Sequence, residues 1–358
     1  MVVPDDANDG AGSALALLLS VELMPPSPAL SRPRLRALSS IAAVAHAALL
    51  GCVSEPDRAA RLPAVATRHA PVASAAPAGA PPAASAKIVS DPAHAFDPPA
   101  LLRLPQSLPP GERVPLLLVL HGFGVSSGLL IAKAGLNQVA DQKKFAYLAP
   151  EGTRDSLGRP FWNAGKSCCD LDHRAIDDVK RLRELLDANL SNPAIDGTRV
   201  FVVGYSNGGF MAQRLACDVG DRIAGVVSVA GASPSPELPC SQSSALAVLE
   251  IHGDADPVVH YSGGTVFDRT DVEPHASALD TAKYWADRLS CKGTPRAGTN
   301  IDLEPYVPER ETAVQRYDDC HGTVELWTVK GGGHYVALQP PALDAIWGFV
   351  QAHPKGGT

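Results

Sequence analysis

The sequence predicts an α/β domain built on an open, doubly wound, mostly parallel sheet with helices on both faces. Two observations predict it. Continuous apolar runs end in glycine or proline, such as PLLLVLHG at 115–122 and FAYLAP at 145–150, and runs of this kind are typical of strands buried on both faces. Segments with helical periodicity separate the runs, and alternating strands and helices form parallel sheets. In such sheets the ligand site lies beyond the carboxyl ends of the strands.

The other elements follow in chain order. The clearest helix is 176–190, whose apolar residues share one face: Ile176, Val179, Leu182, Leu186 and Leu190. A second helix is expected from FMAQRLACDV at 210–219. Further strands are expected at RVFVVG (199–204), IAGVVSVAG (223–231), LAVLEIHG (246–253) and TVELWTV (323–329).

The first quarter of the chain does not read as part of this domain. Three arginines between 32 and 36 precede an apolar stretch, 38–50, that is too short to span a bilayer as a stable helix. The stretch ends in LLGC, which resembles a bacterial lipobox, so we expect residues 1–52 to be a secretory signal with Cys52 lipidated. Ordinary cleaved secretion and a buried helix are the alternatives. Met24 precedes the basic run, so residues 1–23 fit an upstream extension from a misassigned start codon.

Composition sets the remaining boundaries. Residues 53–86 are dominated by Ala, Pro and Ser, which predicts a flexible tether. Residues 87–358 then form the α/β domain. The formal net charge is −7 and there is no basic cluster, so the sequence shows no electrostatic footprint for nucleic acid. We expect an exported protein, either extracellular, periplasmic or a cell-surface lipoprotein, that contacts membrane only through a lipid anchor.

The domain holds six cysteines, Cys168, Cys169, Cys217, Cys240, Cys291 and Cys320. An even number in an exported chain favours three disulfides, whose connectivity the spacing does not resolve. The preferred pairing joins Cys291 to Cys320. The adjacent Cys168 and Cys169 would then reach separately to the other two, because a bridge between neighbours is strained. The CxxC spacing and partner histidines of a zinc site are missing, so no metal is expected.

Two serines lie between suitably spaced glycines. A nucleophile elbow needs glycines two residues before and after its serine, because neighbouring backbone comes too close for side chains. GYSNGG (204–209) places Ser206 between a strand and a helix, whereas GVSSG (124–128) places Ser126 in a loop several residues past the first strand. We therefore interpret Ser206 as the nucleophile and Ser126 as a chance match.

The loop that begins at HGFG suggests a different role for its neighbourhood. Such loops supply one backbone N–H to the oxyanion hole of α/β-hydrolases, and the residue after the nucleophile supplies the other. We assign these donors to Phe123 and Asn207, and a shift by one residue at the first stays open.

A serine nucleophile needs a histidine base that is oriented by a carboxylate, and the chain order in α/β-hydrolases is Ser, acid, His. Asp254 and Asp256 both follow the strand at 246–253. Asp256 is preferred because an apolar segment follows it back into the fold, and Asp254 reads as a turn or capping residue. His334 follows the last strand and three glycines, which lets it bend towards Ser206. His121 and His252, each before a glycine at a strand end, read as structural.

Together these motifs resemble a known family. LHGFG, FWNAGKSCCD, IDDV, GYSNGGFMAQRLAC, IHGDADPVVHYSGG, the pair Trp285 and Cys291, and GGGH are similar to the secreted polyhydroxybutyrate depolymerase and feruloyl esterase group. These are α/β-hydrolase serine esterases related to carbohydrate esterase family one. The resemblance covers about 87–354. It implies the triad above and places Trp162 and Asn163 near the acyl pocket, with a buried core aromatic as the alternative for Trp162.

The chain departs from that family beside the site. Tyr335-Val336-Ala337 stands where Thr-Trp-Pro commonly follows the histidine, Asp254 stands where Thr is usual, and His260 where Pro is usual. The expected function is a serine carboxylic ester hydrolase that needs no cofactor and acts on feruloyl or acetyl esters of plant cell-wall polysaccharide, or on small esters. A polyhydroxyalkanoate depolymerase is the alternative. A serine peptidase or a non-catalytic binding protein of the same fold are the other classes.

Overall fold

A computed structural model describes residues 95–356, apart from 234–239, 241–243, 306, 308–309 and 338. The predicted signal (1–52, with Cys52), the tether (53–86) and the first residues of the predicted domain (87–94) lie outside the described residues. No helix in the described ranges is both long and apolar enough to cross a membrane.

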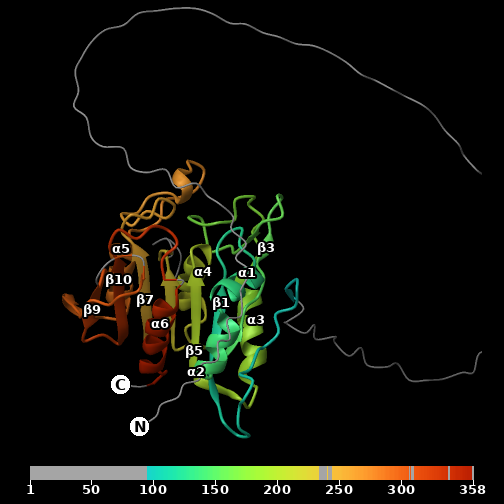
Figure 1. Cartoon of the computed structure of the whole chain (residues 1–358). Helices are drawn as coiled ribbons and strands as arrows, with labels where there is room; N and C mark the ends of the chain where they lie inside the picture. Colours follow the sequence, from blue (N-terminus) through green and yellow to red (C-terminus); the bar gives the residue numbers. More distant parts are fainter. Residues whose placement is uncertain are drawn as a thin grey trace, which may run out of the picture. The chain divides into compact units, whose positions relative to one another are not determined.

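An eight-stranded sheet forms the centre of the domain (Figure 1). Its strands are β1 (Val114–Leu120), β2 (Ala146–Leu148), β5 (Ile195–Tyr205), β6 (Gly225–Val229), β7 (Leu246–Gly253), β8 (Lys292–Ala297), β9 (Thr312–Asp318) and β10 (Gly322–Val329). Two short strands, β3 (Thr153–Arg154) and β4 (Pro160–Phe161), pair with each other. The helices are α1 (Ser127–Lys133), α2 (Leu136–Lys143), α3 (Asp178–Leu190), α4 (Asn207–Asp218), α5 (Ala278–Arg288), α6 (Pro340–Ala352) and the 3₁₀ turn η2 (Val266–Asp268).

The strand order is β2-β1-β5-β6-β7-β10-β9-β8. Strands β2 to β10 of this order pair in parallel, and β9 and β8 add an antiparallel edge. The predicted doubly wound, mostly parallel sheet is therefore confirmed. The antiparallel edge was not predicted, because β8 is largely exposed and contains a glycine and a proline, so it lacks an apolar run.

Alternation along β1 shows how both faces of the sheet are buried. Leu116, Leu118 and Leu120 face one core, with apolar residues of α3, α4 and α5. Leu117 and Val119 face the other core, with residues of α1, α2 and α6. A strand buried on both faces must be apolar at every position, which explains the unbroken run PLLLVL.

The disulfides differ from the expected set. Cys291 pairs with Cys320, and the other bonds are Cys217–Cys240 and Cys168–Cys169. The separate pairing expected for Cys168 and Cys169 is wrong. Cys168 lies beside Asn207 at the start of α4, where the Asn207 amide donates to its sulfur at 3.5 Å. Cys217 lies ten residues along the same helix, about 15 Å away at the usual rise, which is beyond disulfide reach.

Candidate active site

Ser206 occupies the tight turn between β5 and α4. Its backbone is left-handed, with φ 55° and ψ −119°, a conformation that costs a non-glycine residue energy. The Ser206 N–H donates to the Val229 carbonyl at 2.7 Å, which ties the turn to β6. The serine therefore stands at the carboxyl edge of the sheet, where the sequence places it.

The glycines around Ser206 are needed for close backbone approach. A Cβ at Gly204 would collide with the carbonyl of Gly208, and a Cβ at Gly208 would collide with the carbonyl of Leu120. Any side chain at either position would push the strand, the helix and β1 apart. This is the spacing on which the elbow interpretation rests.

Three side chains form a hydrogen-bonded line at this edge. His334 Nε2 lies 3.0 Å from the Ser206 Oγ, and His334 Nδ1 lies 2.8 Å from the Asp256 Oδ2. All three residues are buried. Because Asp256 only accepts, Nδ1 carries the ring proton and leaves the Nε2 lone pair for the serine hydroxyl.

Asp254 lies elsewhere. It pairs with Lys330 at 3.2 Å, and one of its oxygens accepts the Gly331 N–H at 2.7 Å. Asp254 therefore caps the glycine turn that leads to His334, which matches the turn role weighed for it.

Several donors hold Asp256 as a carboxylate. Burial alone would raise its pKa, but hydrogen bonds from His252 and His334 and from the N–H groups of Val258 and Val259 lower the pKa below its usual range. The carboxylate consequently stays charged throughout the neutral range, as a partner for an imidazolium must.

The HGFG loop packs directly against the nucleophile. A Cβ at Gly122 would come within 3.3 Å of the Ser206 Cβ. The Gly124 N–H donates to the Pro160 carbonyl at 2.8 Å and fixes the loop. Within the described part of the chain, neither the Phe123 nor the Asn207 N–H donates to another backbone carbonyl outside regular helices and strands.

Trp162 and Asn163 both make hydrogen bonds within the fold. Trp162 is completely buried and donates its indole N–H to the His121 carbonyl at 3.0 Å. The Asn163 N–H donates to Asp178, and its side-chain amide donates to the Ile176 carbonyl. These contacts fit the core alternative for Trp162, and the place of Trp162 and Asn163 near an acyl pocket stays a prediction.

His121 is structural, as expected. Its Nε2 accepts the Gly152 N–H at 2.8 Å, so Nδ1 carries the proton and donates to the Gly122 carbonyl. His252, in contrast, touches the triad, since its Nε2 lies 3.5 Å from the Asp256 Oδ2. A signal for it was present: Glu250 and His252 stand two residues apart in an otherwise apolar strand and so share one face.

An aromatic pair was missed by sequence reasoning. The Phe123 ring lies 6.3 Å from that of Phe267, edge to face, and the Arg159 guanidinium lies 4.7 Å from the Phe123 ring centre. Phe267 is 48 % exposed and has a φ of 56° within η2. No residue pattern predicts a left-handed phenylalanine, so only the folded chain reveals this pair.

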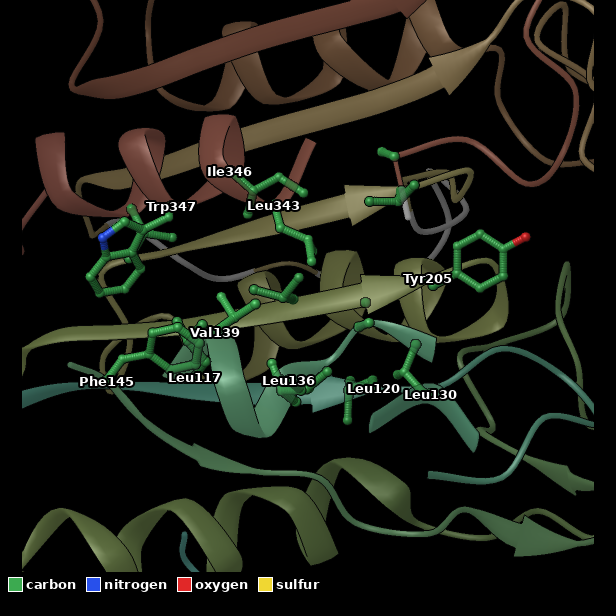
Figure 2. Close-up of a pocket in the computed structure, with 17 residues that line it drawn as sticks. Leu117, Leu120, Leu130, Leu136, Val139, Phe145, Tyr205, Leu343, Ile346 and Trp347 are labelled. Atoms are coloured by element: carbon green, nitrogen blue, oxygen red, sulfur yellow. The ribbon is translucent and has the colours of Figure 1, made fainter. Parts of the chain in front are cut away.

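An apolar cavity of about 80 Å³ lies in the core between the sheet and α1, α2 and α6. Figure 2 shows Tyr205 at one end of its lining, with the hydroxyl pointing away from the labelled aliphatic side chains. The triad residues do not line this cavity. Among the described residues there is also no group of three or more His, Cys, Asp or Glu side chains that could hold a metal ion.

Comparisons with known proteins agree with this geometry. Residues 109–270 match the family described as phospholipase/carboxylesterase. "Putative esterase NocK" of Nocardia uniformis subsp. tsuyamanensis is 34% identical over 236 residues, which are 64% of this chain and 66% of that protein. Feruloyl esterase B of Piromyces equi is 28% identical over 249 residues, 65% of this chain and 42% of that protein. The chain thus spans just under two thirds of the first relative and less than half of the second.

A solved structure supports the fold alone. The acetyl xylan esterase from Aspergillus awamori superposes with a TM-score of 0.50 at 15% sequence identity, over 69% of this chain and 93% of that one. Sheet order, elbow and structural match lead to one assignment: the chain has the α/β-hydrolase fold, and its residues 109–270 are similar to the phospholipase/carboxylesterase family.

Proposed function

We propose that the protein is a serine carboxylic ester hydrolase that works through an acyl-enzyme. One observation carries the proposal: the line from Ser206 Oγ to His334 (3.0 Å) and on to Asp256 (2.8 Å), at a strained elbow. Similarity to relatives named as esterases, 34% identical over 236 residues and 28% over 249, supports it.

The chemistry follows from the hydrogen bonds. Ser206 Oγ attacks the ester carbonyl while His334 Nε2 takes its proton, and Asp256 stabilises the imidazolium that forms. His334 then gives the proton to the leaving alcohol oxygen, which leaves an acyl group on Ser206. Water attacks this acyl-enzyme with His334 again as base; the bond from the acyl carbon to Ser206 Oγ breaks, His334 returns the proton to Oγ, and the acid is released.

Backbone N–H groups are the proposed oxyanion donors. We assign them to Phe123, which follows the Gly122 that packs on Ser206, and to Asn207, which starts α4, whose N-terminal dipole favours negative charge. The Asn207 side chain is not the proposed donor, because both of its polar atoms bind Trp162. Its Oδ1 accepts the Trp162 N–H at 2.7 Å, and its Nδ2 donates to the Trp162 carbonyl at 2.8 Å.

The proposed substrates are feruloyl or acetyl esters of polysaccharide, or small esters. The aromatic pair Phe123 and Phe267 supports an aromatic acyl group. Phe123 carries one of the proposed oxyanion N–H groups, so its ring belongs to the same residue as a group that would contact the ester oxygen. A second candidate is polyester hydrolysis, which a 35% identity over 134 residues to the poly(3-hydroxybutyrate) depolymerase of Ralstonia pickettii favours.

Export is proposed from the cysteines. Three disulfides in the described residues fit an oxidising compartment. A secretory signal ending at Cys52, with lipidation there, would tether the domain at the cell surface. A Cys52→Ala variant tests the anchor: it should leave the membrane fraction, and retention there like wild type would exclude a lipid anchor at this residue.

Hydrolysis by the purified protein tests the enzyme itself. Methyl ferulate, p-nitrophenyl acetate and a hydroxybutyrate oligomer are offered to wild type, Ser206→Ala and Ser126→Ala. We expect Ser206→Ala alone to lose at least about 1,000-fold in kcat, with the preferred ester naming the substrate class. Equal turnover by all three proteins would leave Ser206 as a turn residue and overturn the proposal.

A further inference from the structure

A line of buried polar side chains continues behind the triad, away from the serine. The Trp285 indole donates to the Gln213 Oε1, and the Gln213 Nε2 donates to the Glu250 Oε2 at 3.0 Å. The Glu250 Oε1 lies 3.1 Å from the His252 Nδ1, and His252 reaches Asp256. Helices α5 and α4 and strand β7 thus meet through these groups in the core.

The donors and acceptors in this line are fixed by chemistry. An indole N–H can only donate, so the Gln213 side chain must turn its oxygen to Trp285 and its NH₂ to Glu250. Glu250 therefore accepts at Oε2. Burial raises the pKa of Glu250, and its contacts with His252, Ser228 and Gln213 oppose that rise. An ionised Glu250 accepts from His252 as well as from Gln213.

His252 faces acceptors on both sides of its ring. Nδ1 faces Glu250, while Nε2 lies 2.8 Å from the Val259 carbonyl and 3.5 Å from the Asp256 Oδ2. A neutral imidazole has one N–H, so one nitrogen would oppose its lone pair to an oxygen. With Glu250 ionised, only the doubly protonated ring satisfies these contacts, and at 1% side-chain exposure no solvent competes for them.

Building on the proposed function, we propose that His252 is a positioning residue for the triad. Anchored on Glu250 and on the Val259 carbonyl, its imidazolium fixes the Asp256 carboxylate against His334. The two Asp256 oxygens have different partners. Oδ1 accepts the N–H groups of Val258 and Val259, and Oδ2 contacts both His334 and His252.

The charge of His252 also reaches His334 through the shared carboxylate. Burial would lower the pKa of His252, but contacts with Asp256 and Glu250 raise it to about 10. The other titratable groups near it are His275, whose pKa burial lowers, and Tyr261, whose ring meets the His252 ring edge to face. A positive charge beside Asp256 reduces the negative field at His334 and so favours the neutral base.

The test removes that charge and follows the pH profile. In His252→Gln, we expect kcat on p-nitrophenyl acetate to fall about 10-fold or more, because Asp256 is less well held. The acid limb of kcat/KM, which reports loss of the His334 proton, should move about half a pH unit or more to higher pH. His121→Gln is the matched control: it changes an equally buried histidine before a glycine at a strand end, and should leave the acid limb in place.

An unmoved acid limb in folded His252→Gln would overturn the proposal. If that variant does not fold, ¹⁵N-histidine NMR of wild type decides: we expect one imidazole that keeps both ring protons at pH 8, and a spectrum of only neutral rings would overturn it equally. Wild type that hydrolyses no ester while showing this imidazolium would instead count against the proposed function.

Discussion

The Tyr205 hydroxyl donates a hydrogen bond of 2.9 Å to the backbone carbonyl of His334. The residue before the nucleophile thus holds the loop that carries the proposed base. Burial raises the pKa of Tyr205, so the hydroxyl keeps its proton as a donor across the working range.

Replacing Tyr205 by phenylalanine should therefore loosen the His334 loop. We expect kcat to fall about 10-fold and the free energy of unfolding to fall by about 1–2 kcal/mol, because a carbonyl loses its donor. Tyr335→Phe is the control, since Tyr335 is 76 % exposed. Urea unfolding and ester hydrolysis measure both effects, and equal behaviour of the two variants would contradict the assignment.

Asp256 and Asp254 should separate cleanly by mutation. Asp256→Asn leaves the geometry but favours the wrong His334 tautomer, so kcat should fall by about 10,000-fold. Asp254→Asn should stay active and lose less than about 1 kcal/mol of stability, because its pair with Lys330 is partly exposed. Steady-state kinetics on one ester decides, and a strong loss in Asp254→Asn would reassign the acid.

The raised pKa of His252 predicts an alkaline loss of stability. A group whose pKa is raised on folding stabilises the native state fully below its unfolded pKa, near 6.5, and loses that contribution as pH rises through its folded value of about 10. The unfolding free energy should therefore fall between these pH values. Denaturant titrations should show a steeper fall in wild type than in His252→Gln, and parallel curves would exclude a raised pKa.

Phe267 should affect aromatic acyl groups selectively. In Phe267→Ala, the KM for methyl ferulate should rise about 3- to 10-fold, the usual worth of an aromatic contact, while that for methyl acetate should stay unchanged. These esters share an alcohol and differ only in the acyl group. Leu279→Ala removes a similarly exposed apolar side chain on α5 and serves as the control. A parallel rise for both esters would remove Phe267 from the acyl site.

The bond between Cys291 and Cys320 should matter for stability. It joins the residue before β8 to the β9–β10 turn across 29 positions, for which chain entropy predicts about 3–4 kcal/mol. The Cys291→Ser/Cys320→Ser double variant should show that loss in guanidinium unfolding under non-reducing conditions. An unchanged midpoint would mean that the unfolded chain gains little freedom when this loop opens.

Much of the fold follows from local pattern. The strands of the parallel sheet are unbroken apolar runs, and the predicted 176–190 helix appears as α3, which begins after Asp177, whose side chain caps the Lys180 N–H. Chain order and glycine spacing also single out Ser206, Asp256 and His334, whose side chains lie in one hydrogen-bonded line, and their catalytic roles stay a prediction. Local pattern suffices where one short segment determines the conformation.

Other features depend on segments far apart in the chain. Trp162 is buried because its indole finds the His121 carbonyl, a contact 41 positions away. Cys168 pairs with its neighbour Cys169 because the length of α4 separates Cys168 from Cys217. The proposed positioning role of Glu250 and His252 depends on their contacts with Gln213 and Asp256, which come from other parts of the chain.

The apolar cavity beneath Tyr205 has a mechanical consequence. An apolar cavity of about 80 Å³ is volume that disappears when the chain unfolds. Hydrostatic pressure therefore favours the unfolded state, in proportion to the void volume that disappears. The core of this domain should therefore be softer to compression than a fully packed one. Xenon, which occupies such apolar cavities, should shift the pressure midpoint of unfolding upwards.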